Sequence, residues 1–225
     1  APFCAKQLDE FIQSVKEYSG KDKVNIFAVS HGGQVTGTYL TLYGDKGDVA
    51  NAVMTVPALG GAGLAYNILA DNIEFDEENL IRFIEHGMMF ETDFNWLVRA
   101  NELGFLDEVL NTITPYARQI IGYWGSIWDF CPTEYYEELK AKLLDPTESA
   151  ELIAKSDYMH YQVMTDFSNG FKRAQNAGTD VYIVAGYDNK IVTGLNESSD
   201  GIITIASSTG ATAAPLGQRF ADGYT

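Results

Sequence analysis

The sequence predicts an α/β protein whose mainly parallel sheet is flanked by helices and interrupted by a large helical insertion. Strand and helix patterns alternate over residues 1–59 and return over residues 179–225, as they do where helical crossovers join parallel strands. Residues 60–178 show helical periodicity without strand signals. We therefore expect an α/β core made of the first and last parts, with the middle part as a helical cap.

The chain opens with the pattern of an amphipathic helix. Leu8, Phe11, Ile12 and Val15 recur at i, i+3, i+4 and i+7, and Gly20 suits the helix end. This spacing places the apolar side chains on one face, where they can pack against a sheet.

An apolar strand then passes directly into a helix at Ser30. Residues 24–29, VNIFAV, lack polar alternation apart from Asn25, so we expect a central strand that is covered on both faces. Apolar residues after Ser30 recur at helical spacing: Val35, Tyr39 and Leu42. Ser30 is therefore predicted to lie on a strand-to-helix turn with almost no loop.

Three later segments complete the expected sheet region. Residues 49–59 predict the next strand, which Pro57 closes, and residues 180–186, DVYIVAG, predict another. Residues 198–208, SSDGIITIASS, place Asp200 and Gly201 just before a further apolar run. Ligands bind beyond the carboxyl ends of parallel strands. Ser30 is expected to stand at such an end, where a ligand could reach it.

The middle region contains an aromatic segment, IIGYWGSIWDF, at residues 120–130. Its large aromatic side chains are Tyr123, Trp124, Trp128 and Phe130. One interpretation is a core plug or a seam between helices. The other is a helical lid whose apolar face forms an acyl pocket over the serine.

Charge and composition narrow the function classes. The 225 residues include 15 Lys and Arg against 31 Asp and Glu, a formal net charge of −16. Phosphate backbones and anionic membranes would repel such a chain, so we expect no nucleic-acid partner. No apolar run approaches the roughly 20 residues of a membrane span, so no stable membrane insertion is expected.

The two cysteines, Cys4 and Cys131, allow one disulfide at most and cannot form a four-cysteine zinc site. Both are equally compatible with small buried apolar residues. We expect no metal and no cofactor.

The residues around Ser30 form a variant of the nucleophile elbow. Ala28, Gly32 and Gly33 give the pattern A-x-S-x-G-G, in which alanine replaces the first glycine. A turn this sharp brings neighbouring chain close to the serine, so only small residues are expected to fit. The alternative is a plain glycine-rich turn.

The strands VNIFAVSHGG and VYIVAG, together with SDGIITIASS, resemble secreted bacterial lipases and esterases of the α/β-hydrolase superfamily. The resemblance covers both ends of the chain but not its helical middle. It implies that Ser30 is the nucleophile, that Asp200 is the catalytic acid, that the substrate is a small-molecule ester or lipid, and that the protein is secreted or extracellular. Asp188 also follows a strand end and is the competing acid.

The chemistry explains why these residue types are needed. A serine hydroxyl attacks an ester only when a base removes its proton, and an aspartate orients that base. The backbone N–H of His31 is expected to stabilise the oxyanion, with help from the helix dipole. The His31 imidazole is interpreted as pocket lining or packing.

The expected triad lacks its base. His86 and His160 precede the acid and fall in helical patterns, where a surface or satisfied core histidine is the simpler interpretation, and no histidine follows Asp200. We expect the base to come from polypeptide beyond Thr225 and further strands from before Ala1, as companion segments of one precursor.

Three functions remain open at this point. The first is a serine hydrolase of carboxylic esters, acting through an acyl-enzyme on Ser30. The second is a catalytically silent hydrolase-fold protein that binds an apolar ligand or a partner. The third is an acyltransferase, which uses the same serine and differs only in the acceptor.

Overall fold

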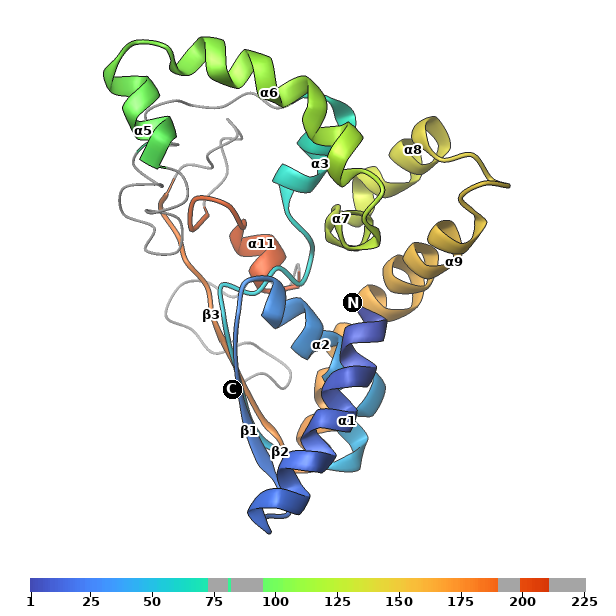
Figure 1. Cartoon of the computed structure of the whole chain (residues 1–225). Helices are drawn as coiled ribbons and strands as arrows, with labels where there is room; N and C mark the ends of the chain where they lie inside the picture. Colours follow the sequence, from blue (N-terminus) through green and yellow to red (C-terminus); the bar gives the residue numbers. More distant parts are fainter. Residues whose placement is uncertain (73–80, 82–94, 190–198, 211–225) are drawn as a thin grey trace.

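A parallel sheet of three strands, in the order β1–β2–β3, lies beneath a group of helices in the computed structural model, which describes residues 1–72, 81, 95–189 and 199–210 (Figure 1). The strands are β1 (Val24–Val29), β2 (Val49–Thr55) and β3 (Asp180–Val184). The α-helices are α1 (Pro2–Ser19), α2 (His31–Tyr43), α3 (Gly63–Ala70), α5 (Asn95–Glu102), α6 (Leu106–Ile121), α7 (Gly125–Phe130), α8 (Thr133–Leu143), α9 (Ala150–Tyr158), α10 (Phe167–Asn176) and α11 (Ile205–Ser208).

The three strands end in one row. Val29 pairs with Thr55, and Thr55 pairs with Val184. Beyond this row, the Ser30 N–H donates to the Thr55 carbonyl at 3.0 Å and the Val56 N–H donates to the Val184 carbonyl at 2.6 Å. The carboxyl ends therefore form a straight edge on which residues from three distant segments meet, as the α/β pattern predicts.

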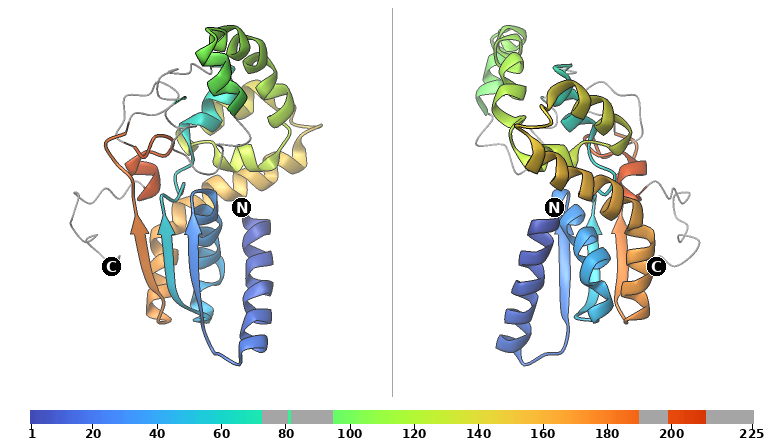
Figure 2. Two further views of the ribbon diagram at one scale, coloured as in Figure 1. Left: turned by 60° about the vertical axis from the view of Figure 1, so that its left-hand side comes forward. Right: turned by 90° about the vertical axis from the view of Figure 1, so that its right-hand side faces the viewer.

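Helices α1, α2 and α10 all lie on the same face of the sheet (Figure 2). The largest side chains of the core between them and the strands include Tyr39, Leu40, Met54 and Phe171. Helices α2 and α10 approach closely, since a Cβ on Gly170 would lie 2.6 Å from the Cα of Thr41. The sheet is thus held by one apolar layer.

The expectation that β1 is central and covered on both faces is wrong for the described sheet. β1 is an edge strand, and its side chains alternate in exposure: Phe27 is 72% exposed and Val29 is also exposed, whereas Ala28 is buried. Across the sheet, Tyr182 of β3 belongs to the same exposed face and is 40% exposed. β1 has apolar side chains at exposed positions as well as at buried ones. The sequence therefore lacks the alternation of polar and apolar residues that indicates a strand with one face open to solvent.

A second group of helices lies beyond the carboxyl ends of the strands (Figure 1). Helices α3, α7 and α8 pack around their own cluster, which includes Trp128, Tyr136 and Leu139. We call the described helices α3 and α5 to α9 the helical region. The range 60–178 expected for the cap also includes α10, which instead packs against α2.

One helical run connects the helical region with the sheet. Helix α9 continues into a π-helical turn (Met159–Val163), then a 3₁₀ turn (Met164–Asp166), and then α10 without a break. A short 3₁₀ helix (Gly44–Lys46) follows α2.

Two further expectations are settled by the described residues. The apolar run after Asp200 forms turns and the short helix α11 rather than a strand. Cys4 and Cys131 are both free; Cys4 is exposed, and burial raises the pKa of Cys131 to about 12.

Within the described ranges, no helix combines the length and the apolar composition needed to cross a bilayer.

Alanine substitutions at the two elbow glycines, Gly32 and Gly33, are expected to have different effects on stability. A Cβ on Gly33 would lie 2.3 Å from the Cβ of Pro57, whereas the nearest atom to a Cβ on Gly32 is the Ala28 Cβ at 3.8 Å. Gly33→Ala should therefore lower the free energy of unfolding by about 1–3 kcal/mol through overpacking. Gly32→Ala, the matched control in the same helical turn, should leave it unchanged or raise it by up to about 1 kcal/mol. Urea denaturation measures both, and equal effects would contradict the close contact.

Candidate active site

Ser30 has a backbone conformation that serines rarely adopt. It directly follows β1, precedes the first residue of α2, and has φ 53° and ψ −121°. At the end of the neighbouring strand, Val56 also has a positive φ, of 43°. A positive φ is unfavourable for residues with a Cβ, particularly a β-branched one. Such strain is held only where the surrounding structure fixes it, and it is common at functional sites.

Hydrogen bonds hold Ser30 from both sides. Its N–H extends the β1–β2 ladder to Thr55, and its carbonyl oxygen accepts from the N–H groups of Gly33 at 2.9 Å and Ala58 at 3.3 Å. The loop after β2 is in turn pressed against the elbow (residues 28–33), because Pro57 touches the backbone at Gly33. The elbow pattern was therefore correct about the strand-to-helix turn, and Gly33 is the glycine that packing requires.

The first amide of α2 belongs to His31. An α-helix supplies no i−4 acceptor for its first N–H groups, and its dipole makes this end partially positive. The His31 N–H that is expected to stabilise an oxyanion is therefore at the positive end of α2.

The His31 ring packs against the helical region. It contacts Phe130 edge-on, with the ring centroids 5.3 Å apart, and the next turn of α2 is tied to α7 because Gln34 Nε2 donates to the Asp129 carbonyl at 2.9 Å. Burial, and then the positive charge of the Ala1 amine, lower the pKa of His31, while Asp129 opposes them. Its Nε2 is buried without a hydrogen-bond partner among the described residues.

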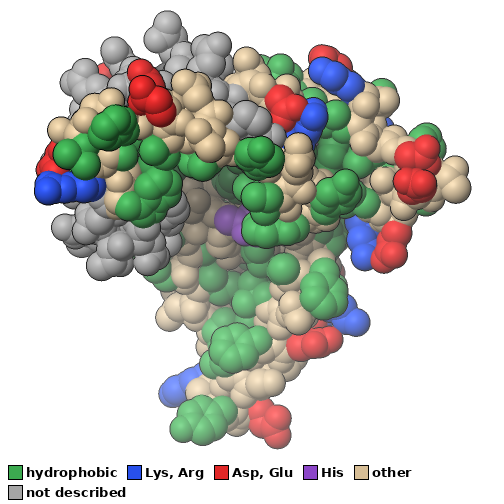
Figure 3. All heavy atoms as spheres, turned by 45° about the horizontal axis from the view of Figure 1, so that its top comes forward, with side chains coloured by type: hydrophobic (Ala, Val, Ile, Leu, Met, Phe, Trp, Pro, Cys, Tyr) green, Lys and Arg blue, Asp and Glu red, His purple; other side chains and the backbone are tan. Residues whose placement is uncertain are grey.

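The surface is hollowed where the helical region meets the sheet. Hydrophobic side chains surround the hollow, and a histidine is visible in it (Figure 3). Of the two described histidines, His31 is partly exposed and His160 is fully buried.

Asp200 lies at the carboxyl end of β3. A Cβ on Gly186 would be 2.4 Å from the Asp200 Cβ, so the aspartate packs directly on the backbone that leaves this strand. Its Oδ1 accepts from the N–H groups of Ile202 at 2.8 Å and Ile203 at 2.7 Å. β1 and β3 are two strand spacings apart, roughly 10 Å.

Asp188 is less well placed for this role. It is exposed and has a φ of 63°, and its neighbour Asn189 bridges to Ser199 in the segment that leads to Asp200. Asp188 is thus exposed, whereas Asp200 is partly buried and packs against the backbone at Gly186.

His160 is occupied by structural hydrogen bonds. Its Nε2 lies 2.9 Å from the Trp128 carbonyl, which can only accept, so Nε2 carries the proton and Nδ1 accepts from the Thr133 hydroxyl at 2.9 Å. Its ring stacks on Tyr136 with centroids 4.0 Å apart. This is the satisfied core histidine that the sequence suggested. His86 lies outside the described residues.

The four aromatic residues of the expected acyl pocket differ in burial, although Tyr123 and Trp128 line one cavity of about 400 Å³ and Phe130 packs against the cluster that contains Trp128. Trp128 is 1% exposed in the core of the helical region, and its Nε1 donates to the Gly122 carbonyl at 2.8 Å. Tyr123 and Trp124 are 85% and 57% exposed. Phe130 reaches the elbow through its contact with His31.

A cavity of about 370 Å³ lies beside the elbow rather than at Ser30. Its described lining comes from the loop after β2, the start of α8, the turn before α10, and α11, and Ser30, His31 and Asp200 are not part of it. The loop after β2 nonetheless links the two, because Ala58 holds the Ser30 carbonyl and the next residue, Leu59, lines the cavity. Sequence patterns did not indicate this cavity, because its lining is scattered over 150 residues with no local motif.

Comparisons of the chain with protein-family models, curated proteins and solved structures find no match. The resemblance to α/β-hydrolases therefore rests on the residues of the elbow and of the acid segment.

The protonation of His160 is expected to couple stability to pH. Burial lowers its pKa below the usual 6.5 and outweighs the Trp128 carbonyl, Asp129 and Asp157, which raise it, while Lys140 adds a further lowering. The unfolded chain then binds a proton more readily, so the free energy of unfolding should fall as the pH drops below about 6.5. In His160→Gln this fall between about pH 7 and pH 5 should be smaller.

Urea denaturation at several pH values measures this difference. His31→Gln serves as the comparison, because it removes only the contribution of His31. A His160→Gln variant that keeps the full pH dependence would contradict the assignment.

Proposed function

We propose that this protein is a serine hydrolase of carboxylic esters with an α/β-hydrolase-like core. The observation that carries the proposal is the strained Ser30 on a strand-to-helix turn at the carboxyl edge of a parallel sheet. A protein without acyl chemistry gains nothing from holding a serine in this conformation.

In the proposed reaction, Ser30 Oγ attacks the ester carbonyl carbon while a base takes its proton. The carbonyl oxygen becomes an oxyanion that the His31 N–H stabilises. When the intermediate collapses, the carbon–oxygen bond to the alcohol breaks, and the alcohol takes the proton from the base. Water then repeats the sequence on the acyl-enzyme and releases the acid.

Asp200 would orient the base and stabilise its charged form. Its Oδ1 is held by two backbone N–H groups, and among the described residues no donor meets Oδ2. A carboxylate fixed on one oxygen and open on the other is suited to accept from an imidazole. We propose that a histidine outside the described residues supplies that imidazole.

One observation favours the alternative of a catalytically silent protein with this core. Both nitrogens of His160 are used in structural hydrogen bonds, and the His31 ring packs against Phe130. Neither described histidine is therefore positioned as a base for Ser30. Direct labelling of the serine separates the two functions.

Ser30 is expected to be the site of covalent modification and of turnover. The protein, expressed from its complete coding sequence, should react with a fluorophosphonate probe and hydrolyse p-nitrophenyl butyrate. Ser30→Ala should abolish labelling and lower kcat by roughly 10³–10⁶-fold, whereas Ser19→Ala, at an exposed serine of α1, should change neither. Mass spectrometry of the labelled peptide identifies the site. A folded protein whose Ser30 stays unlabelled would support the silent alternative.

Paired substitutions are expected to identify the acid. Asp200→Asn keeps an oxygen for the Ile202 and Ile203 amides but removes the charge, so it should lower kcat by roughly 10⁴-fold without unfolding the loop. Asp188→Asn should leave kcat about unchanged. Steady-state kinetics on the same ester decide between them, and the reverse result would assign the acid to Asp188.

A further inference from the structure

The cavity beside the elbow combines an apolar lining with one charged group. Leu59, Pro132, Met164 and Phe167 supply apolar surface, and Glu134 is the only charged residue among the described lining residues. Its volume of about 370 Å³ falls within the range of small-molecule sites, about 300–1,000 Å³.

The hydroxyl groups around the cavity are already committed to the protein. Thr133 faces His160 Nδ1 at 2.9 Å, Thr165 donates to the Tyr161 carbonyl at 2.8 Å, and Ser207 donates to the Gly61 carbonyl at 2.5 Å. Thr204 Oγ1 accepts from the Ser207 N–H at 3.1 Å. The O–H groups of Thr133, Thr165 and Ser207 are therefore already used, whereas Thr204 is engaged only through its accepting oxygen.

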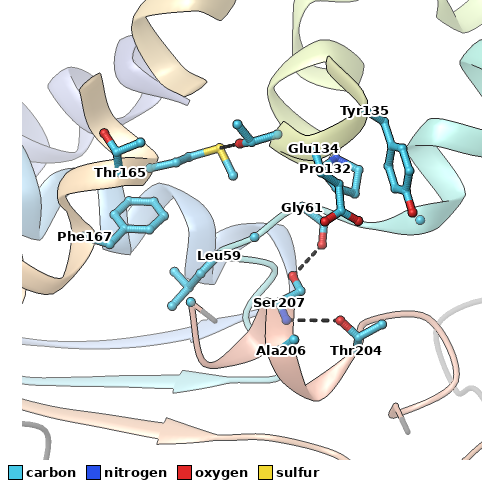
Figure 4. Close-up of a pocket in the computed structure, with 15 residues that line it drawn as sticks. Leu59, Gly61, Pro132, Glu134, Tyr135, Thr165, Phe167, Thr204, Ala206 and Ser207 are labelled. Carbon is cyan, nitrogen blue, oxygen red and sulfur yellow. Dashed lines mark hydrogen bonds between the residues drawn. The ribbon is translucent and has the colours of Figure 1, made fainter. Parts of the chain in front are cut away.

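Glu134 differs from these hydroxyls. It is an exposed residue in the first turn of α8 that also lines the cavity, and among the described residues no cation or hydrogen-bond donor meets its carboxylate. Figure 4 shows Glu134 next to Tyr135 on one side of the cavity, with Ser207 and Ala206 below and Phe167 opposite. The ring of Tyr135 is braced from behind by Tyr66, with centroids 4.2 Å apart. The cavity is thus lined by one carboxylate and by two aromatic side chains, Tyr135 next to it and Phe167 opposite.

We propose that this cavity binds a small organic ammonium ion with an apolar body. The ammonium group would form an ion pair with the Glu134 carboxylate and a cation–π interaction with the face of an aromatic ring, whereas a neutral donor could form only a hydrogen bond with the carboxylate. The apolar body would lie against Leu59, Met164 and Phe167. This site does not depend on the proposed catalysis, because none of its residues takes part in that mechanism.

Glu134 also has a purely structural explanation. A carboxylate in the first turn of a helix interacts favourably with the helix dipole. That role would make Glu134 matter for the stability of α8 but would give the cavity no preference among ligands. Binding selectivity therefore distinguishes the two roles, whereas stability does not.

The experiment compares phenethylamine with phenethyl alcohol, which have the same aromatic body, by isothermal titration calorimetry on the unmodified protein. The amine should bind at least about fivefold more tightly than the alcohol. In Glu134→Gln this preference should disappear. Glu138→Gln is the matched control, because Glu138 is an exposed carboxylate of the same helix that does not line the cavity, and this variant should keep the preference.

Several results would overturn the site. They are no binding of the amine at millimolar concentration, equal binding of the two compounds, a preference that survives in Glu134→Gln, or the same loss in Glu138→Gln, which would indicate attraction by the net negative charge alone. Because binding is measured without turnover, an inactive Ser30 leaves the result interpretable.

Discussion

The backbone at Gly33 lies so close to Pro57 that no side chain fits between them, and the arrangement of the candidate site depends on this contact. It sets the angle at which α2 leaves β1, and it fixes the loop that leaves β2. With both fixed, the Ser30 carbonyl can accept from Gly33 and Ala58, which holds the serine in its unfavourable conformation. The strain at Ser30 is therefore sustained by packing three residues away, at Gly33.

The candidate site is divided between backbone and side chains. Main-chain hydrogen bonds position Ser30 at the end of β1, and the Asp200 side chain is held by the N–H groups of Ile202 and Ile203. The helical region contributes mainly surface: Phe130 against His31, and the start of α8 beside the cavity. A division of this kind lets the walls of a binding site vary while the reacting groups stay in place.

Sequence reasoning succeeded where structure is determined locally. The strand at residues 24–29, the turn at Ser30 and the following helix come from short-range patterns, and the structure contains all three. It failed where distant residues decide the outcome. The exposure of Phe27 depends on which face the helices cover, and the burial of Trp128 next to an exposed Trp124 depends on contacts with α8. After Asp200, an apolar run that suggested a strand instead turns, because the aspartate side chain captures two backbone N–H groups that a strand would have used.

The uninterrupted helical run from α9 to α10 makes the connection between the helical region and the sheet a stiff one. A helix has a fixed rise of about 1.5 Å per residue, so its two ends stay at a fixed distance from each other. A loop of the same number of residues would allow that distance to change. Tilting the helical region relative to the sheet therefore requires a change of backbone hydrogen bonding within the run. The π-helical and 3₁₀ turns at residues 159–166 are where that bonding already departs from the α pattern. This irregular part of the run contains His160, which is hydrogen-bonded to Trp128 of α7 and to Thr133 of α8. How easily the run bends there therefore depends on residues outside it.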